Sequence, residues 1–146
     1  MCYCKERIVF MSAGTKITFQ LYSGREVELN EQEGILAALV VDSLEKSGID
    51  KDLIHVVRKS DSYTTIVVRH DDHDQDLMRF KFTPRAKWVS VPIIDKNRQQ
   101  YINDAMFSAQ KNKRQGMWKA RIENPADAVE FVPIMLDAYE HAKSLI

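Results

Sequence analysis

Apolar and polar residues alternate in two short segments near the start of the chain. The first covers residues 15–22 and the second residues 25–29, with Ser23-Gly24 between them. A period of two is typical of a half-buried strand, and a two-residue link containing Gly suits a tight turn. We therefore expect a β-hairpin over residues 15–29.

The next segment has the period of an amphipathic helix. Asn30 stands three residues before Glu33, which is the arrangement of a capping box. Gly48 suits the left-handed position that ends many helices. These features predict a helix over residues 31–47, followed by a short turn capped by Asp50.

Strand patterns return in the middle of the chain. Arg79 and Lys81 alternate with apolar neighbours, so they should face away from the core. Pro92 should lie near a sheet edge or at the end of its strand, because proline cannot donate to the ladder. The predicted strands are 63–70, 77–82, 87–94 and 117–122.

Two later segments have helical spacing. Residues 95–111 predict a helix or two short turns. Asn124-Pro125 followed by Asp127 is a typical helix start. Pro133 lies inside this last pattern and predicts a kink or break, because it removes one backbone hydrogen bond.

This order of elements favours an α+β fold. We expect an antiparallel or mixed sheet of hairpins with about three helices packed on one face, in two layers. A chain of 146 residues fits a single compact domain over residues 1–146.

The composition is that of an ordinary soluble protein, with 45% hydrophobic and 29% charged residues. The longest apolar run, residues 35–41, is too short for a membrane span, and the N-terminal residues lack the apolar core of a signal peptide. We therefore expect a cytoplasmic protein without a membrane partner. Cys2 and Cys4 are interpreted as reduced thiols, and no cofactor is expected.

Charge is unevenly distributed along this neutral chain. Residues 77–121 contain eleven Lys and Arg but only two acidic residues, Asp95 and Asp104, so this segment carries +9 and the rest −9. Such a local positive potential favours an anionic partner.

Lys and Arg neutralise phosphates, and an exposed Trp can stack on an unpaired base. We therefore predict a non-enzymatic module with a face that binds nucleic acid or another anion. Its predicted members are Arg79, Lys81, Arg85, Lys87, Lys111, Lys113, Arg114, Trp118 and Lys119. Two alternatives remain open: the cations pair with acidic helices within the fold, or they bind an acidic protein surface, as in a subunit or inhibitor of a larger nucleic-acid enzyme.

A metal-dependent hydrolase or nuclease is the remaining alternative. Residues 70–76 contain two imidazoles and four carboxylates, which are suitable metal ligands. They fall between two strands, where an exposed turn offers little support to a metal, so His70 and His73 are only weak candidates. Glu26, Glu28, Asp61 and Lys81 could serve a nuclease, but their spacing matches no motif. The sequence also lacks a nucleophile elbow and a phosphate loop.

Overall fold

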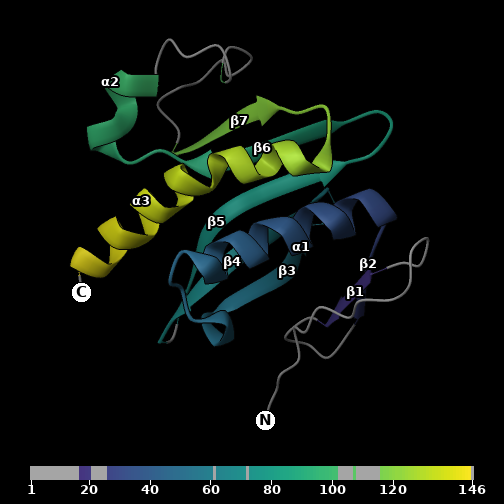
Figure 1. Cartoon of the computed structure of the whole chain (residues 1–146), viewed down its shortest axis with the longest axis horizontal. Coiled ribbons are helices and arrows are strands. Elements are labelled where there is room, and N and C mark those ends of the chain that lie inside the picture. Colours follow the sequence, from purple (N-terminus) through teal and green to yellow (C-terminus); the bar gives the residue numbers. More distant parts are fainter. Residues whose placement is uncertain are drawn as a thin grey trace.

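The computed structural model describes residues 17–20, 26–60, 62–71, 73–101, 107 and 116–145. Their centre is a five-stranded antiparallel sheet in the order β3-β4-β5-β6-β7 (Figure 1). Each strand pairs with the next one in the sequence, which makes the sheet a meander of hairpins. The strands are β3 (Ile54–Ser60), β4 (Tyr63–His70), β5 (His73–Phe82), β6 (Lys87–Pro92) and β7 (Met117–Arg121).

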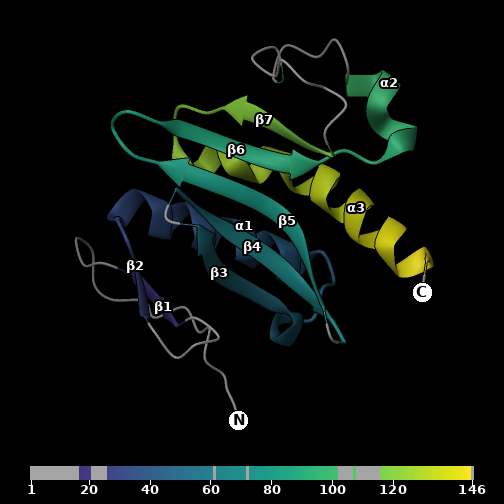
Figure 2. The same cartoon turned by 180° about the vertical axis from the view of Figure 1, so that it is seen from behind.

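Helices α1 (Glu31–Lys46) and α3 (Val132–Ser144) cover one face of this sheet. Figure 2 shows the strands from behind, with both helices beyond them. The short helix α2 (Arg98–Tyr101) lies in the connection between β6 and β7. The predicted α+β fold with a sheet of hairpins and helices is confirmed, and the five-stranded sheet is antiparallel rather than mixed.

The first hairpin is confirmed as a separate two-stranded sheet. Strands β1 (Ile17–Gln20) and β2 (Glu26–Leu29) pair antiparallel, with Phe19 opposite Val27. The predicted turn at Ser23-Gly24, as well as Cys2 and Cys4, lies outside the described residues.

The core lies between the sheet and the two helices. Phe80 of β5, Val89 of β6 and Trp118 of β7 contribute fully buried side chains from the sheet. Leu36 and Met135 contribute from α1 and α3. Because side chains alternate along a strand, the residues between these core positions face the opposite side of the sheet.

The predicted capping box at the start of α1 is present and also binds the sheet. Asn30 Oδ1 accepts from the Glu33 amide at 2.8 Å, while Asn30 Nδ2 donates to the Phe82 carbonyl at 2.8 Å. Glu33 Oε2 in turn accepts from the Phe82 amide at 3.0 Å. At the other end of α1, Gly48 has a φ of 110°, as expected for a C-terminal glycine.

The last helical segment changes from a 3-10 helix to an α-helix close to Pro133, where the sequence predicted a kink or break. A 3-10 helix, η4 (Pro125–Phe131), leads into α3, and Pro133 lies in the first turn of α3. There its missing amide costs nothing, because the first amides of a helix have no partner within it. None of the described helices is long and apolar enough to cross a membrane.

The predicted start of strand β5 differs from the structure. Strand β5 begins at His73 rather than at residue 77, so most of the expected polar turn belongs to a strand. A bulge at Leu77 then interrupts the alternation, since Val67 pairs with Asp76 and Ile66 with Met78. In residues 95–111, the described part forms two short helices, η2 (Asp95–Asn97) and α2, in agreement with the predicted alternative of two short turns.

Candidate functional site

Side chains of β5, β6 and β7 form two rows on the sheet face away from α1 and α3. The strand register defines the first row as Lys81, Trp88 and Arg121, and the second as Arg79, Ser90 and Lys119. We call these six residues the cationic face. In each row, one cation from β5 and one from β7 flank a residue of β6, the strand between them.

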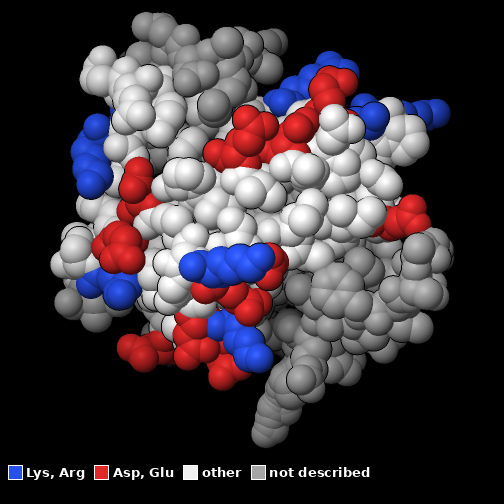
Figure 3. Space-filling model, in the orientation of Figure 1, with Lys and Arg blue, Asp and Glu red and all other residues white. Residues whose placement is uncertain are grey.

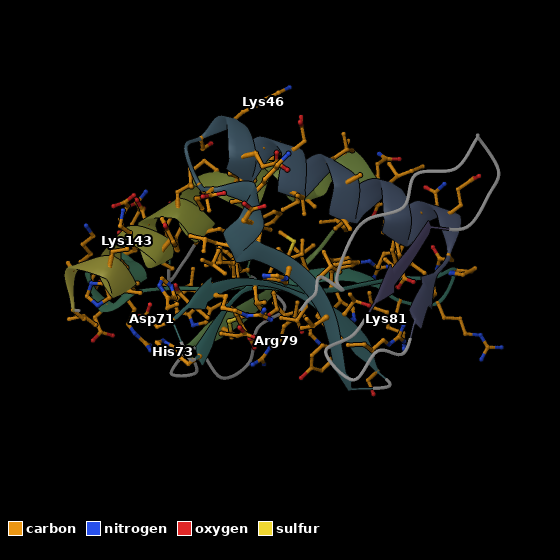
Figure 4. All side chains as sticks on the ribbon, turned by 90° about the horizontal axis from the view of Figure 1, so that it is seen from below. Lys46, Asp71, His73, Arg79, Lys81 and Lys143 are labelled. Carbon is orange, nitrogen blue, oxygen red and sulfur yellow. The ribbon has the colours of Figure 1, made fainter. Side chains whose placement is uncertain are left out.

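The orientation of these rows follows from the core positions beside them. Phe80 and Val89 are fully buried on the helix side, so Arg79, Lys81 and Trp88 project from the other side. Figure 4 shows Arg79 and Lys81 on the side of the sheet opposite Lys46, which belongs to α1.

Aromatic rings and cations are interleaved on this face. Lys119 Nζ lies 4.3 Å from the centroid of the Trp88 ring, within the range of a cation–π contact. Tyr63 of β4 meets Trp88 edge to face, with centroids 6.1 Å apart, and Arg79 Cζ lies 5.6 Å from the Tyr63 ring. Trp88 and Tyr63 are both partly exposed.

These side chains surround a hollow with a volume of about 310 Å³. Its lining includes Tyr63, Arg79, Trp88, Ser90, Met117 and Lys119. The hollow therefore offers aromatic surface, hydroxyl groups and two cations in one place.

The sheet keeps some cations of this face from pairing with the carboxylates of the helices. Figure 3 shows the helix side, where carboxylates lie over α1 and over the segment that leads into α3. Lys81 and Arg121 point away from that side, and neither belongs to an ion pair between described residues. Arg79 is paired locally, with its Nη2 3.0 Å from Asp76 Oδ2. The sheet thus separates most of the positive charge of this face from the helix carboxylates.

The structure removes Trp118 from the predicted binding face. Its side chain has no exposed surface and packs edge to face against Phe107, with ring centroids 5.6 Å apart. A fully buried ring cannot stack on a base, so the prediction for Trp118 is wrong. The exposed counterpart is Trp88.

The other predicted cations divide into three groups. Arg79, Lys81 and Lys119 come together on the cationic face. Arg85 is exposed in the β5–β6 turn, whereas Lys87 lies on the helix side, with its Nζ 5.4 Å from the Phe82 ring centroid. The rest of the predicted set lies outside the described residues: Lys111, Lys113 and Arg114.

Lys87 belongs instead to a groove of about 560 Å³ at the starts of α1 and η4. Capping boxes stand at both helix starts, where the Glu33 amide donates to Asn30 Oδ1 and the Asn124 amide donates to Asp127 Oδ2. Glu31 and Glu123 also line this groove and oppose an anionic ligand.

Sequence reasoning missed Trp88, Arg121 and Tyr63 as members of the face. The strand period could have found the first two. Trp88 is out of phase with the apolar pair Val89 and Val91, whereas Trp118 is in phase with Ala120. Tyr63 required the tertiary structure, because its contact with Trp88 joins two strands that are not neighbours in the sheet.

Strand alternation separates the two histidines of the weak metal candidate from Asp74 and Asp76, whereas Asp72 lies outside the described residues. His70 and His73 stack with centroids 5.5 Å apart, and His70 Nε2 is hydrogen-bonded to Gln75 Oε1 at 2.7 Å. Asp74 and Asp76 form ion pairs with Arg69 and Arg79 on the other face. Among the described residues, no group of three or more His, Cys, Asp or Glu is arranged to hold a metal ion.

The nuclease set is also dispersed in the part of the chain that the structure describes. Glu26 and Glu28 belong to β2, in the smaller sheet, while Lys81 belongs to β5 in the larger one. Asp61 lies outside the described residues.

No protein-family model matches the sequence, and no curated protein or solved structure is significantly similar to the chain.

Proposed function

We propose that this protein is a non-enzymatic module that binds nucleic acid through the cationic face. One observation carries the proposal. In each of two rows across β5, β6 and β7, a residue of β6 lies between two cations, and in the first row that residue is Trp88. The cations form two columns, Arg79 and Lys81 on β5 and Lys119 and Arg121 on β7. Neighbouring strands lie ~4.8 Å apart, so the two columns run parallel, with β6 between them. A phosphate backbone presents evenly spaced negative charges that two such columns can neutralise.

The aromatic residues favour nucleic acid over an acidic protein surface. Carboxylates on a protein need only the cations, whereas Trp88 and Tyr63 add π surface that stacks on bases. Lys81 and Arg121 also remain available, because the sheet keeps them away from the carboxylates of α1 and α3.

The test is fluorescence anisotropy with labelled single- and double-stranded oligonucleotides at several salt concentrations. The double variant Lys81→Glu/Arg121→Glu should bind about tenfold more weakly or worse, because it reverses two phosphate contacts. Its matched control is Lys46→Glu/Lys143→Glu, which changes the net charge equally but on the exposed surfaces of α1 and α3. This control should retain binding.

Two results would contradict the proposal. One is an absence of oligonucleotide binding by the wild type at low salt, where counterion release is most favourable. The other is an equal loss of affinity in both double variants, which would reflect net charge rather than this face.

A further inference from the structure

The hollow beside Trp88 has the size of a ligand site and a specific chemistry. Its volume of about 310 Å³ lies at the lower end of the range of roughly 300–1,000 Å³ seen for ligand pockets. The rings of Tyr63 and Trp88 stand at 62° to each other and provide two aromatic surfaces. Arg79 and Lys119 place positive charge at the same hollow.

From this arrangement we infer that the hollow receives one unpaired nucleobase of a single strand, while the cation columns hold the phosphates on either side. This inference rests on the proposed function and specifies its ligand. A base is planar and carries hydrogen-bonding groups on its edge. It therefore fits a hollow with aromatic surface and the hydroxyl groups of Ser62, Tyr63 and Ser90.

The register explains why base and phosphates would be bound together. Trp88 lies between Lys81 and Arg121 in the first row, at one strand spacing of ~4.8 Å from each. Ser90 lies in the same way between Arg79 and Lys119 in the second row. A single strand that follows β6 thus meets cations on both sides and an aromatic ring at the centre.

Bases of a duplex cannot use this hollow. They are stacked and paired, so a partly exposed ring between two columns of cations contacts only the backbone of the duplex. A single strand exposes its bases, and stacking on Trp88 then adds to the phosphate contacts. We therefore expect a preference for single strands that depends on Trp88.

Lys119 must move for the base to stack on the face of Trp88 that it covers. Its ammonium lies 4.3 Å from the ring centroid, and the side chain is exposed. A lysine has a flexible four-carbon stem, so the ammonium can transfer from the ring to a phosphate of the bound strand. In this way the free protein holds a cation where the complex would hold a base.

The experiment compares two labelled probes in anisotropy titrations. One is a single-stranded thymidine oligonucleotide, and the other has the same length and phosphates but consists of abasic residues. Wild type should bind the thymidine probe more tightly. Trp88→Leu should lose roughly 5- to 150-fold in affinity for thymidine, the loss of one stacked base, and little for the abasic probe.

Trp88→Phe is the matched control, because it keeps a smaller aromatic ring and should retain most of the preference. Tryptophan fluorescence provides a second measurement that does not require the Leu variant to fold. The thymidine probe should quench the wild type but not Trp88→Phe, whose remaining Trp118 is fully buried.

The outcomes separate this inference from the proposed function. Equal binding of both probes by the wild type, or no quenching of Trp88 at saturation, would overturn the base subsite and leave phosphate binding in place. An equal loss for both probes in Trp88→Leu would also overturn it. If neither probe binds at low salt, the proposed function fails as well.

Discussion

At the scale of residues, the two tryptophans show how one strand position decides between core and surface. Both stand next to a lysine in the sequence, yet Trp118 is fully buried and Trp88 is partly exposed. The difference is the phase of each ring relative to its apolar neighbours along the strand. Four cations surround the partly exposed ring and only Arg79 is shown paired with a described carboxylate, Asp76, so the environment of the ring in the free protein should be positive.

This environment can be measured with ionic quenchers of tryptophan fluorescence. Relative to free N-acetyltryptophanamide, iodide should quench the wild type more strongly and caesium more weakly, because a positive potential near Trp88 concentrates anions and repels cations. The difference should disappear in Trp88→Phe, since Trp118 has no exposed surface. A ratio to free N-acetyltryptophanamide that is the same for both ions would contradict a positive potential at this ring.

The alternation of apolar and polar residues along the strands predicted much of the cationic face. The parts that it did not predict have physical explanations. It placed Arg79 and Lys81 opposite the core correctly. It could not show that Lys119 and Arg121 lie across β6 from them, because that depends on how strands far apart in the sequence pair. It also placed Asp74 and Asp76 in a turn, since polar residues are common both in turns and on the exposed face of a strand.

At the scale of elements, the start of α1 is joined directly to the end of β5. Glu33 is buried and accepts from the Phe82 amide as well as completing the capping box. Asp127 completes a similar box at η4, but its partners are the exposed amides of Glu123 and Asn124. The sequence predicted both caps from local spacing, whereas the link to Phe82 crosses 49 positions and has no local pattern.

The two acidic residues should therefore differ in their contribution to stability. Glu33→Ala should lower the free energy of unfolding by about 2–3 kcal/mol, because it removes a cap and leaves a buried amide without a partner. Asp127→Ala should cost about 1 kcal/mol, because water can replace its partners. Chemical denaturation of both variants measures the difference, and equal losses would contradict the role of the Phe82 contact.

At the scale of the whole molecule, the sheet divides a neutral chain into two surfaces of different charge. The described carboxylates of α1 and α3 face one side, and the cationic face lies on the other. The sequence has an isoelectric point of about 6.9, so net repulsion between copies is minimal near neutral pH. Under these conditions the opposite surfaces of two molecules attract each other.

We therefore expect weak self-association at neutral pH and low salt. Sedimentation should give a higher average mass in low salt than at physiological ionic strength, where exposed charges are screened. Lys81→Glu/Arg121→Glu should reduce this association, because it removes positive charge from one of the two surfaces. A mass that does not change with salt would contradict electrostatic attraction between copies.

Strand β7 joins the described sheet through β6 alone, and it carries half of the cations of the face. Terminal strands open more readily than central ones, so the second column of charges exists only while this strand is closed. A ligand that holds both columns binds the closed form and favours it over the open form. If the proposed function holds, binding of a polyanion should therefore increase the protection of the β7 amides from exchange with solvent.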